Sequence, residues 1–278
     1  MLKLGLIGYP VGHSLSPWIH NQLMDKAGLK GSYELMEIQP EDFDHRIQAL
    51  KEMNLDGFNV TIPYKEKIIN YLDEIDEAAE HLGAVNTVKL ENGRWIGYNT
   101  DGIGYLKSIQ NRFPHVELST RKILVLGSGG AARGIIFALA EAGCKEIDVA
   151  NRTVGKAEEL IKELEASLSA TAIDLEQASQ NIKDYDFIIQ TTSVGMNPNP
   201  ENQIIKLEQL NERAIVSDIV YRPMETQFLR AAQAKGASIQ FGHEMLLHQA
   251  VYSFQIWTGK KVDVTDMLTD FEAVLKGV

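Results

Sequence analysis

The stretch Lys122-Ile-Leu-Val-Leu-Gly-Ser-Gly-Gly-Ala-Ala-Arg-Gly134 joins an apolar run to a helical pattern. The residues before its first glycine are mostly aliphatic, as in a buried parallel strand, and residues Ala131–Ala142 follow the helical pattern. Between the two, Gly127, Gly129 and Ala132 fit the spacing G-x-G-x-x-[GA]. A strand, a tight glycine turn and a helix in this order predict the first unit of a dinucleotide-binding α/β domain, although an ordinary α/β protein can also contain such a turn.

The end of the next predicted strand indicates which dinucleotide binds. A domain specific for NAD carries Asp or Glu there to hold the ribose 2′-hydroxyl, and that carboxylate would repel a 2′-phosphate. This chain has Asn151, Arg152 and Thr153 instead. Arg152 can pair with a phosphate and stack on the adenine, so the sequence predicts NADP(H). Taken alone, Arg152 could equally be a solvated surface arginine.

Apolar runs and amphipathic stretches alternate along the whole chain, which is typical of α/β folds with parallel sheets and crossover helices. Strands are predicted at Leu2–Ile7, Ser32–Ile38, Gly57–Ile62, Asn86–Leu90, Ile123–Leu126, Ile147–Ala150, Ala170–Ile173, Phe187–Gln190, Ile215–Ile219 and Ser238–Phe241. Helices are predicted at Trp18–Ala27, Glu41–Met53, Ala131–Ala142, Lys156–Leu168, Thr226–Ala234 and Met245–Thr258.

A polar, proline-broken segment near Asn111–His115 suggests a domain boundary between Gly102 and Thr120. We therefore expect a first domain over residues 1–102, joined by C-terminal helices at about 243–278, and a second domain over residues 103–242.

Composition limits the function. The 278 residues are 44% hydrophobic and carry a net charge of −11, which disfavours nonspecific nucleic-acid binding. Cys144 is the single cysteine, so no intramolecular disulfide and no cysteine-based zinc cluster can form. The seven histidines show no H-E-x-x-H spacing, and no apolar run has transmembrane length. We expect a cytoplasmic protein without a metal site or a membrane partner.

Polar residues collect at predicted strand ends in the first domain. Asn59 and Thr61 share one face of their strand, and Lys65 follows Pro63 after the strand ends. Asn86 opens another strand, and Asp101 lies in a predicted glycine-bracketed loop. Each has a plain alternative as a turn former, a cap or a surface residue. Together they suggest a ligand site, because open α/β sheets bind ligands beyond the carboxyl ends of their strands.

The loop Gly8–Pro17 adds two hydroxyls between glycines and prolines. Ser16 before Pro17 is predicted as a helix N-cap, which leaves Ser14 without a structural role. The sequence alone leaves the use of the second hydroxyl open, and we interpret His13 as a loop-packing residue.

At this point the chain resembles the shikimate dehydrogenase family, over essentially its whole length. The resemblance rests on Gly-His-Ser-Leu-Ser-Pro (12–17), Asn-Val-Thr-Ile-Pro-Tyr-Lys (59–65), Gly-Ala-Val-Asn-Thr (83–87), Gly-Tyr-Asn-Thr-Asp-Gly (97–102), Gly-Ser-Gly-Gly-Ala-Ala-Arg (127–133), Asn-Arg-Thr (151–153), Thr-Thr-Ser-Val-Gly-Met (191–196), Asp-Ile-Val-Tyr (218–221) and Gly-His-Glu-Met-Leu-Leu-His-Gln-Ala (242–250).

The resemblance implies NADP-dependent reduction of 3-dehydroshikimate to shikimate in aromatic amino-acid biosynthesis. It implies a substrate domain with a mainly parallel sheet, a Rossmann-type NADP domain, and an active site in the cleft between them, in a monomer or homodimer. It implies that the substrate carboxylate is held by Ser14 and Ser16 with Tyr221 nearby, that the ring hydroxyls are held by Asn59, Thr61, Asn86, Asp101 and Gln249, and that Lys65 and Asp101 are the catalytic pair. It implies that NADP is held by Gly127, Ser128, Gly129, Gly130, Ala131, Asn151, Arg152 and Thr153, with Thr191, Ile219, Gly242 and Met245 on the nicotinamide side.

Two positions depart from the family pattern. Ser128 stands where the glycine loop usually has Ala, and Arg222 stands where Asn usually follows the tyrosine. Three alternatives stay open: a non-catalytic NADP sensor, a quinate/shikimate dehydrogenase that prefers NAD, and another two-domain dehydrogenase such as the methylenetetrahydrofolate type. The sequence also leaves open whether Lys65 donates the proton or stabilises the alkoxide while water donates it.

Overall fold

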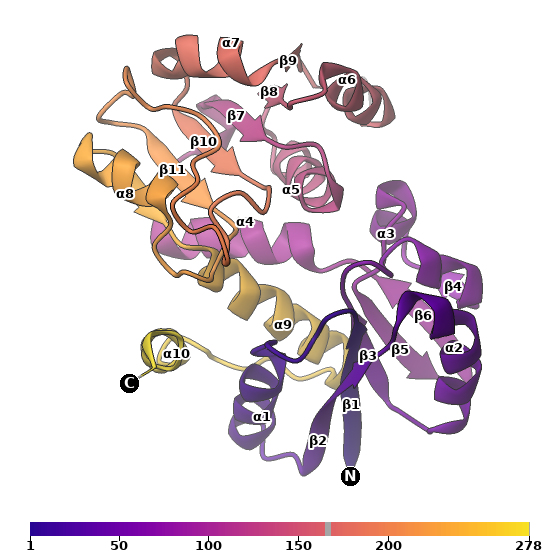
Figure 1. Ribbon diagram of the computed structural model, residues 1–278. Helices are drawn as coiled ribbons and strands as arrows, with labels where there is room; N and C mark the ends of the chain where they lie inside the picture. Colours follow the sequence, from indigo (N-terminus) through magenta and orange to yellow (C-terminus); the bar gives the residue numbers. More distant parts are fainter. Residues whose placement is uncertain (165–167, 278) are drawn as a thin grey trace. The chain divides into compact units, whose positions relative to one another are not determined.

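A computed structural model describes residues 1–164 and 168–277 (Figure 1). Contacts between Cα atoms divide the chain into two compact units. Unit 1 contains Met1–Gly104 and Gln249–Met267, and unit 2 contains Tyr105–His248 and the residues from Leu268 to the C-terminus. The division falls within three helices, α4 (Asp101–Arg112), α9 (Gly242–Thr258) and α10 (Met267–Lys276), of which α10 has only its first residue in unit 1.

Unit 1 is built on one six-stranded mixed sheet in the order β2-β1-β3-β5-β6-β4. Its strands are β1 (Leu2–Gly8), β2 (Gly31–Glu37), β3 (Gly57–Val60), β4 (Glu74–Ile75), β5 (Thr87–Glu91) and β6 (Arg94–Tyr98). β1 pairs in parallel with β2 and β3, whereas β5 pairs antiparallel with β3 and β6. The sheet is therefore parallel in the half that contains the first three strands.

The β5–β6 hairpin turns at Asn92-Gly93, where both residues have positive φ. This dipeptide is the strongest short hairpin signal, because both central residues of the tight turn need positive φ. β6 was not predicted from the sequence although the signal was present.

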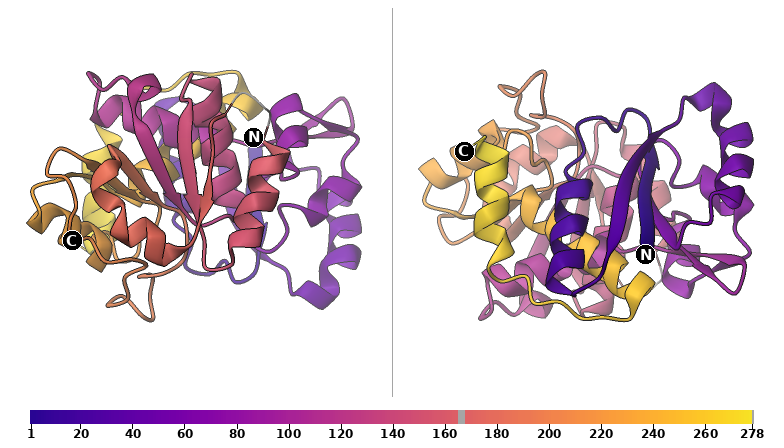
Figure 2. Two further views of the ribbon diagram at one scale, coloured as in Figure 1. Left: turned by 90° about the horizontal axis from the view of Figure 1, so that it is seen from above. Right: turned by 90° about the horizontal axis from the view of Figure 1, so that it is seen from below.

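Helices and buried apolar side chains hold the sheet of unit 1. The helices are α1 (Ser16–Lys26), α2 (Phe43–Glu52) and α3 (Glu77–Leu82), with 3₁₀ turns η1 (Pro40–Asp42) and η2 (Lys67–Tyr71). α1 lies beside β2, as Figure 2 (right) shows. Phe58, Val88 and Trp95 lie buried in the core. Trp257 of α9 is buried too, and its indole N–H donates to the Val88 carbonyl oxygen at 2.9 Å.

Unit 2 contains a six-stranded parallel sheet in the order β12-β11-β10-β7-β8-β9 (Figure 2, left). Its strands are β7 (Lys122–Leu126), β8 (Glu146–Ala150), β9 (Ala172–Ile173), β10 (Phe187–Gln190), β11 (Ile215–Asp218) and β12 (Ser238–Gln240). Along β7, Ile123 and Val125 enter one apolar cluster, and Leu124 and Leu126 enter another. This order, with apolar side chains on both faces, is the Rossmann arrangement predicted from the glycine turn.

Helices α5 (Gly130–Glu141), α6 (Val154–Glu163), α7 (Leu175–Gln180) and α8 (Gln227–Ala234) flank this sheet, with 3₁₀ turns η3 (Leu118–Thr120) and η4 (Ile182–Asp184). Unit 2 also contains most of α4, the start of α9 and nearly all of α10. Within the described ranges, no helix is long and apolar enough for a membrane crossing.

The structure corrects several predicted boundaries. Asp101 is the first residue of α4 and not part of a loop, because the helix begins directly after Thr100. The strand from Gly57 ends at Val60, so Thr61 lies beyond the sheet. The helix from Lys156 to Leu168 is observed as α6, which ends at Glu163, and residues 165–167 lie outside the described residues. The elements β4, β6, α3, α4 and α7 were not predicted, whereas α10 lies within the C-terminal helices expected at about 243–278.

Candidate active site

Lys65 and Asp101 form a close ion pair in unit 1. The Lys65 Nζ atom donates to Asp101 Oδ2 at 2.5 Å. The Asp101 side chain is 11% exposed and the Lys65 side chain 30%, so the pair is accessible mainly from the lysine side. Lys65 lies in the turn before η2, and Asp101 opens α4, where a carboxylate is favoured by the helix dipole. The two residues proposed as the catalytic pair thus meet although 36 positions separate them.

Asn86 fixes the second oxygen of Asp101. Its Nδ2 donates to Asp101 Oδ1 at 2.8 Å and to Thr100 Oγ1 at 3.0 Å. Its Oδ1 accepts from the Thr100 backbone N–H at 2.9 Å and from Thr87 Oγ1 at 2.9 Å. Because a backbone N–H can only donate, the amide orientation of Asn86 is unambiguous.

Asn59 lies deeper in the same network. Its Oδ1 accepts from the Tyr33 hydroxyl at 2.7 Å, and its Nδ2 lies 3.1 Å from each of Asn86 O, Thr87 Oγ1 and Ser253 Oγ. Only 6% of Asn59 is exposed. Its carboxamide is thus engaged within the protein, behind the Lys65–Asp101 pair.

The serine loop lies at the carboxyl end of β1. Ser14 Oγ donates to Ser16 Oγ at 3.1 Å and accepts from the Ser16 backbone N–H at 3.2 Å. Ser16 is therefore not the N-cap that the sequence suggested: Leu15 holds the cap position without a side-chain hydrogen bond, and Ser16 is the first helical residue. Ser14 satisfies the Ser16 N–H, and Pro17 then needs no acceptor because it has no N–H.

Thr61 is tied to the same loop. Its backbone N–H donates to the Ile7 carbonyl at 2.9 Å, and the Tyr9 N–H donates to the Ile62 carbonyl at 3.0 Å. Gln249 lies in the unit 1 part of α9, whereas Tyr221 belongs to unit 2. The substrate residues predicted in unit 1 therefore come from the ends of β1 and β3, the start of β5, and two helices.

The glycine turn of unit 2 fits a dinucleotide. Gly127 has φ +113°, and a methyl group added there would lie 2.6 Å from Thr191 Oγ1, so glycine is required. α5 begins at Gly130 with Gly129 as N-cap, and no described side chain caps it. An added methyl group at Gly129 or Gly130 would meet open space. The first N–H groups of α5 are thus open to an anion.

The end of β8 carries the predicted ribose-phosphate side. Arg152 and Thr153 are exposed, and Asn151 Nδ2 donates to the Thr153 carbonyl at 3.0 Å. No carboxylate stands in this Asn-Arg-Thr segment. The residues present fit a 2′-phosphate better than a free 2′-hydroxyl.

The four residues predicted on the nicotinamide side lie at strand ends of unit 2 and at the start of α9. A methyl group added at Gly242 would lie 2.3 Å from the Ile219 carbonyl oxygen, so only glycine allows this backbone contact. Thr191 Oγ1 donates to the Leu126 carbonyl at 2.8 Å, and Met245 is 9% exposed.

Comparison with known proteins agrees with this arrangement. A family model for the shikimate dehydrogenase substrate-binding domain matches residues 6–88, one for shikimate/quinate 5-dehydrogenase matches residues 107–221, and one for the shikimate 5′-dehydrogenase C-terminal domain matches residues 242–269. The chain belongs to the shikimate dehydrogenase family.

Individual relatives of the shikimate dehydrogenase family match nearly the full length. A protein of Oceanobacillus iheyensis named shikimate dehydrogenase (NADP(+)) is 49% identical over 278 residues, covering 99% of both chains. The crystal structure of shikimate 5-dehydrogenase from Thermus thermophilus in complex with NADP(H) and shikimate has a TM-score of 0.85 at 37% identity, covering 95% of each chain. Quinate dehydrogenase from Corynebacterium glutamicum in complex with NAD has a TM-score of 0.88 at 29% identity, covering 98% of this chain and 99% of the other.

Four buried polar residues beside the shikimate dehydrogenase site were missed by sequence reasoning: Tyr33, Thr87, Thr100 and Ser253. Each contacts Asn59 or Asn86 directly. The only sequence signal was a hydroxyl on an otherwise buried element, and that signal does not distinguish a site from an ordinary satisfied core group.

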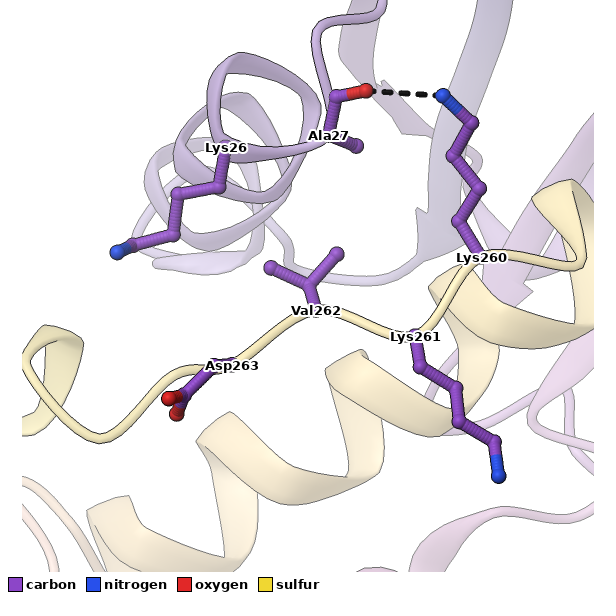
Figure 3. Close-up of a pocket in the computed structure, with 6 residues that line it drawn as sticks. All are labelled: Lys26, Ala27, Lys260, Lys261, Val262 and Asp263. Atoms are coloured by element: carbon purple, nitrogen blue, oxygen red, sulfur yellow. Dashed lines mark hydrogen bonds between the residues drawn. The ribbon is translucent and has the colours of Figure 1, made fainter.

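A separate hollow of about 490 Å³ lies in unit 1 (Figure 3). It is lined by Lys26, Ala27, Lys260, Lys261, Val262 and Asp263, which include none of the predicted site residues. Lys260 Nζ donates to the Ala27 carbonyl at 2.9 Å at the end of α1, and Lys26 pairs with Asp266. These lysines hold the segment after α9 against α1.

Several buried ionisable groups lie apart from the Lys65–Asp101 pair. Burial raises the pKa of Glu244 on α9 to about 7, against the opposing charge of Arg112, whose Nη1 lies 3.3 Å away. Burial also raises the pKa of Asp218 to about 7, although Thr226 donates to its carboxylate. Burial lowers the pKa of His20 to about 3. Among the described residues, no cluster of histidine, cysteine and carboxylate side chains is placed to hold a metal ion.

Proposed function

We propose that this chain catalyses the reversible, NADPH-dependent reduction of 3-dehydroshikimate to shikimate. The proposal rests on one observation above all: in a chain of this family, Lys65 and Asp101 form a 2.5 Å pair whose carboxylate is held on both oxygens. An NADP-binding sensor has no use for a lysine and a carboxylate fixed in this way.

Bound NADPH supplies the hydride for the ketone carbon, and the protein supplies and orients the proton. Lys65 Nζ donates the proton to the carbonyl oxygen, which becomes the new hydroxyl. Asp101 keeps the ammonium directed, because its Oδ1 is held by Asn86 and its Oδ2 by Lys65. In the oxidative direction, Lys65 takes the proton back from the hydroxyl.

The serine loop holds the substrate carboxylate. Ser14 and Ser16 offer hydroxyls at the start of α1, where the helix dipole also favours an anion. We assign Tyr221 to the same carboxylate, and Asn59, Thr61, Asn86, Asp101 and Gln249 to the ring hydroxyls. The carboxamide of Asn59 is also hydrogen-bonded to Tyr33, Thr87 and Ser253.

The glycine turn and the end of β8 hold the cofactor. Gly127, Ser128, Gly129, Gly130 and Ala131 offer backbone N–H groups to the pyrophosphate at the start of α5. Asn151, Arg152 and Thr153 bind the 2′-phosphate, and Thr191, Ile219, Gly242 and Met245 line the nicotinamide side. We place the protein in the cytoplasm as a monomer or homodimer with small-molecule ligands only, consistent with its net charge of −11.

The function is tested by NADPH oxidation with 3-dehydroshikimate, measured beside 3-dehydroquinate. We expect turnover with the first and little with the second. Preferential turnover of 3-dehydroquinate would place the chain among the quinate enzymes instead.

Lys65→Ala tests the proton donor. We expect kcat to fall by about 10²- to 10⁴-fold while NADP affinity is retained, because one positioned acid is lost. Lys67→Ala is the matched control, since Lys67 lies two residues after Lys65 and pairs with Asp44 outside the site. Turnover of the Lys65 variant equal to that of the Lys67 variant would refute the assignment.

A further inference from the structure

Ser253 occupies the centre of the buried polar network in unit 1. It lies on α9 with 0% exposure. Its Oγ atom lies 2.7 Å from Thr87 Oγ1, 3.2 Å from Thr100 Oγ1 and 3.1 Å from Asn59 Nδ2. It also donates to the Gln249 carbonyl oxygen, at 3.0 Å. One hydroxyl group thus bridges the helix, two strands and the residue directly before Asp101.

The first connection leads to Gln249, one helical turn before Ser253. The Ser253 hydroxyl donates its one proton to the carbonyl of Gln249, and its oxygen accepts from Asn59 Nδ2 of the sheet. On the other side of that turn, a methyl group added at Gly104 of α4 would lie 2.6 Å from the Gln249 backbone nitrogen. The backbone of Gln249 is therefore confined between the network and the first turn of α4.

The second connection leads to the Lys65–Asp101 pair. Thr87 and Thr100 contact Ser253 and also bond Asn86 Oδ1. These bonds keep the oxygen of the Asn86 amide toward the network and its nitrogen toward Asp101.

The third connection leads to the serine loop. Asn59 donates to Ser253 and accepts from the Tyr33 hydroxyl. Burial raises the pKa of Tyr33, and a hydrogen bond with Ser16 acts in the opposite direction. Tyr33 therefore lies between the network and the loop proposed to bind the carboxylate.

We infer that Ser253 is a positioning residue of the substrate site: its hydroxyl sets the place of Gln249 and, through Thr87 and Thr100, the orientation of Asn86 toward Asp101. The inference rests on the proposed function, because these groups are the proposed substrate contacts. Since the Ser253 side chain is fully buried, it acts through its neighbours and touches no ligand. Small displacements of contact groups weaken catalysis steeply, so the loss should be visible in kinetics.

Ser253→Ala removes the hydroxyl with little change in volume. We expect KM for shikimate to rise about tenfold or more and kcat to fall, with KM for NADP within about twofold of wild type. Ser108→Ala is the matched control: Ser108 is also fully buried, donates to the Tyr105 carbonyl at 2.6 Å and accepts from Gln240 at 2.6 Å, but lies in unit 2. Both variants should lose thermal stability, but only the first should change KM for shikimate. An unchanged KM and kcat in folded Ser253→Ala would overturn the inference.

Thr87 gives a second route that does not depend on the folding of the Ser253 variant. Thr87→Val removes the hydroxyl at constant volume and should raise KM for shikimate, whereas Thr87→Ser retains it and should stay near wild type. In the Ser253→Ala/Thr87→Val double variant, KM for shikimate should exceed that of the more impaired single variant by no more than about twofold, because both hydroxyls serve one network. The shared network would be refuted if the two single effects on KM multiplied in the double variant, or if Thr87→Val and Thr87→Ser changed KM equally. Absence of shikimate turnover in the wild-type chain would instead refute the proposed function.

Discussion

Glu244→Gln should change how the stability of the protein depends on pH. Glu244 lies in the first turn of α9 and is 3% exposed. Arg112 of α4 faces it, and Glu272 of α10 repels its charge. Beside it on α9, His243 lies 3.5 Å from Glu272, and Lys276 pairs with the same glutamate. Glutamine keeps the shape of the side chain and removes its titration.

The size of the change in unfolding free energy follows from the shift in the pKa of Glu244. Burial raises the pKa of Glu244 from 4.5 to about 7 in the folded protein. The folded state therefore holds this proton more tightly than the unfolded state, so the stabilisation is complete below about pH 4.5 and is lost as the pH rises through about 7. A difference of about 2.5 units corresponds to about 3 kcal/mol. Glutamine cannot lose a proton, so the variant should avoid this loss.

Urea unfolding followed by far-UV circular dichroism measures the effect. The unfolding free energy of the variant minus that of wild type should rise by about 3 kcal/mol between about pH 4 and about pH 8.5. Taking this difference removes the contributions of His243, His248 and Asp218, which both proteins share. Glu80→Gln, at an exposed site, is the control variant. If the difference in unfolding free energy for Glu244→Gln does not change with pH, the reasoning is refuted.

Two further changes test other parts of the molecule. Arg152→Ala should raise KM for NADP by roughly ten- to a hundredfold and KM for NAD much less, because only NADP carries the phosphate that Arg152 is proposed to bind; equal effects on both cofactors in steady-state kinetics would contradict this role. Trp257→Phe should lower the unfolding free energy by about 1 to 3 kcal/mol, because the buried Val88 carbonyl loses its indole donor. Urea unfolding checks the latter, and an unchanged midpoint would mean that the hydrogen bond adds nothing.

The fold class was predictable because it depends on local patterns. Gly127 and Gly129 between a strand and a helix indicated the Rossmann unit, and family membership and the parallel six-stranded sheet confirm the α/β prediction. Short elements were missed for a physical reason. β4 has two residues and α3 has six, too few to show a period. Asp101 was placed in a loop because its flanking glycines suggested a turn, whereas Gly97 belongs to β6 and Gly102 is the second residue of α4.

The residues of the candidate site were predictable from the sequence, but the buried residues that hydrogen-bond to them were not. Lys65, Asn86 and Asp101 could be named because polar groups at strand ends are conspicuous, and their family motifs agree. Their roles stay predictions until tested by mutation. Ser253 could not be found from sequence, because one serine on an apolar helix gives no sign of what lies opposite. Its partners Thr87 and Thr100 are more than 150 positions away along the chain.

The buried indoles of the unit 1 core also have an optical consequence. The chain has three tryptophans, Trp18, Trp95 and Trp257, and all belong to unit 1. Tryptophan emission therefore reports the environment of unit 1 alone, whereas the far-UV signal contains the helices of both units. If the two signals change at different urea concentrations, the transition that emission does not follow belongs to unit 2. The wild-type chain thus carries a built-in label for one half, and the two halves can be followed separately without any added dye.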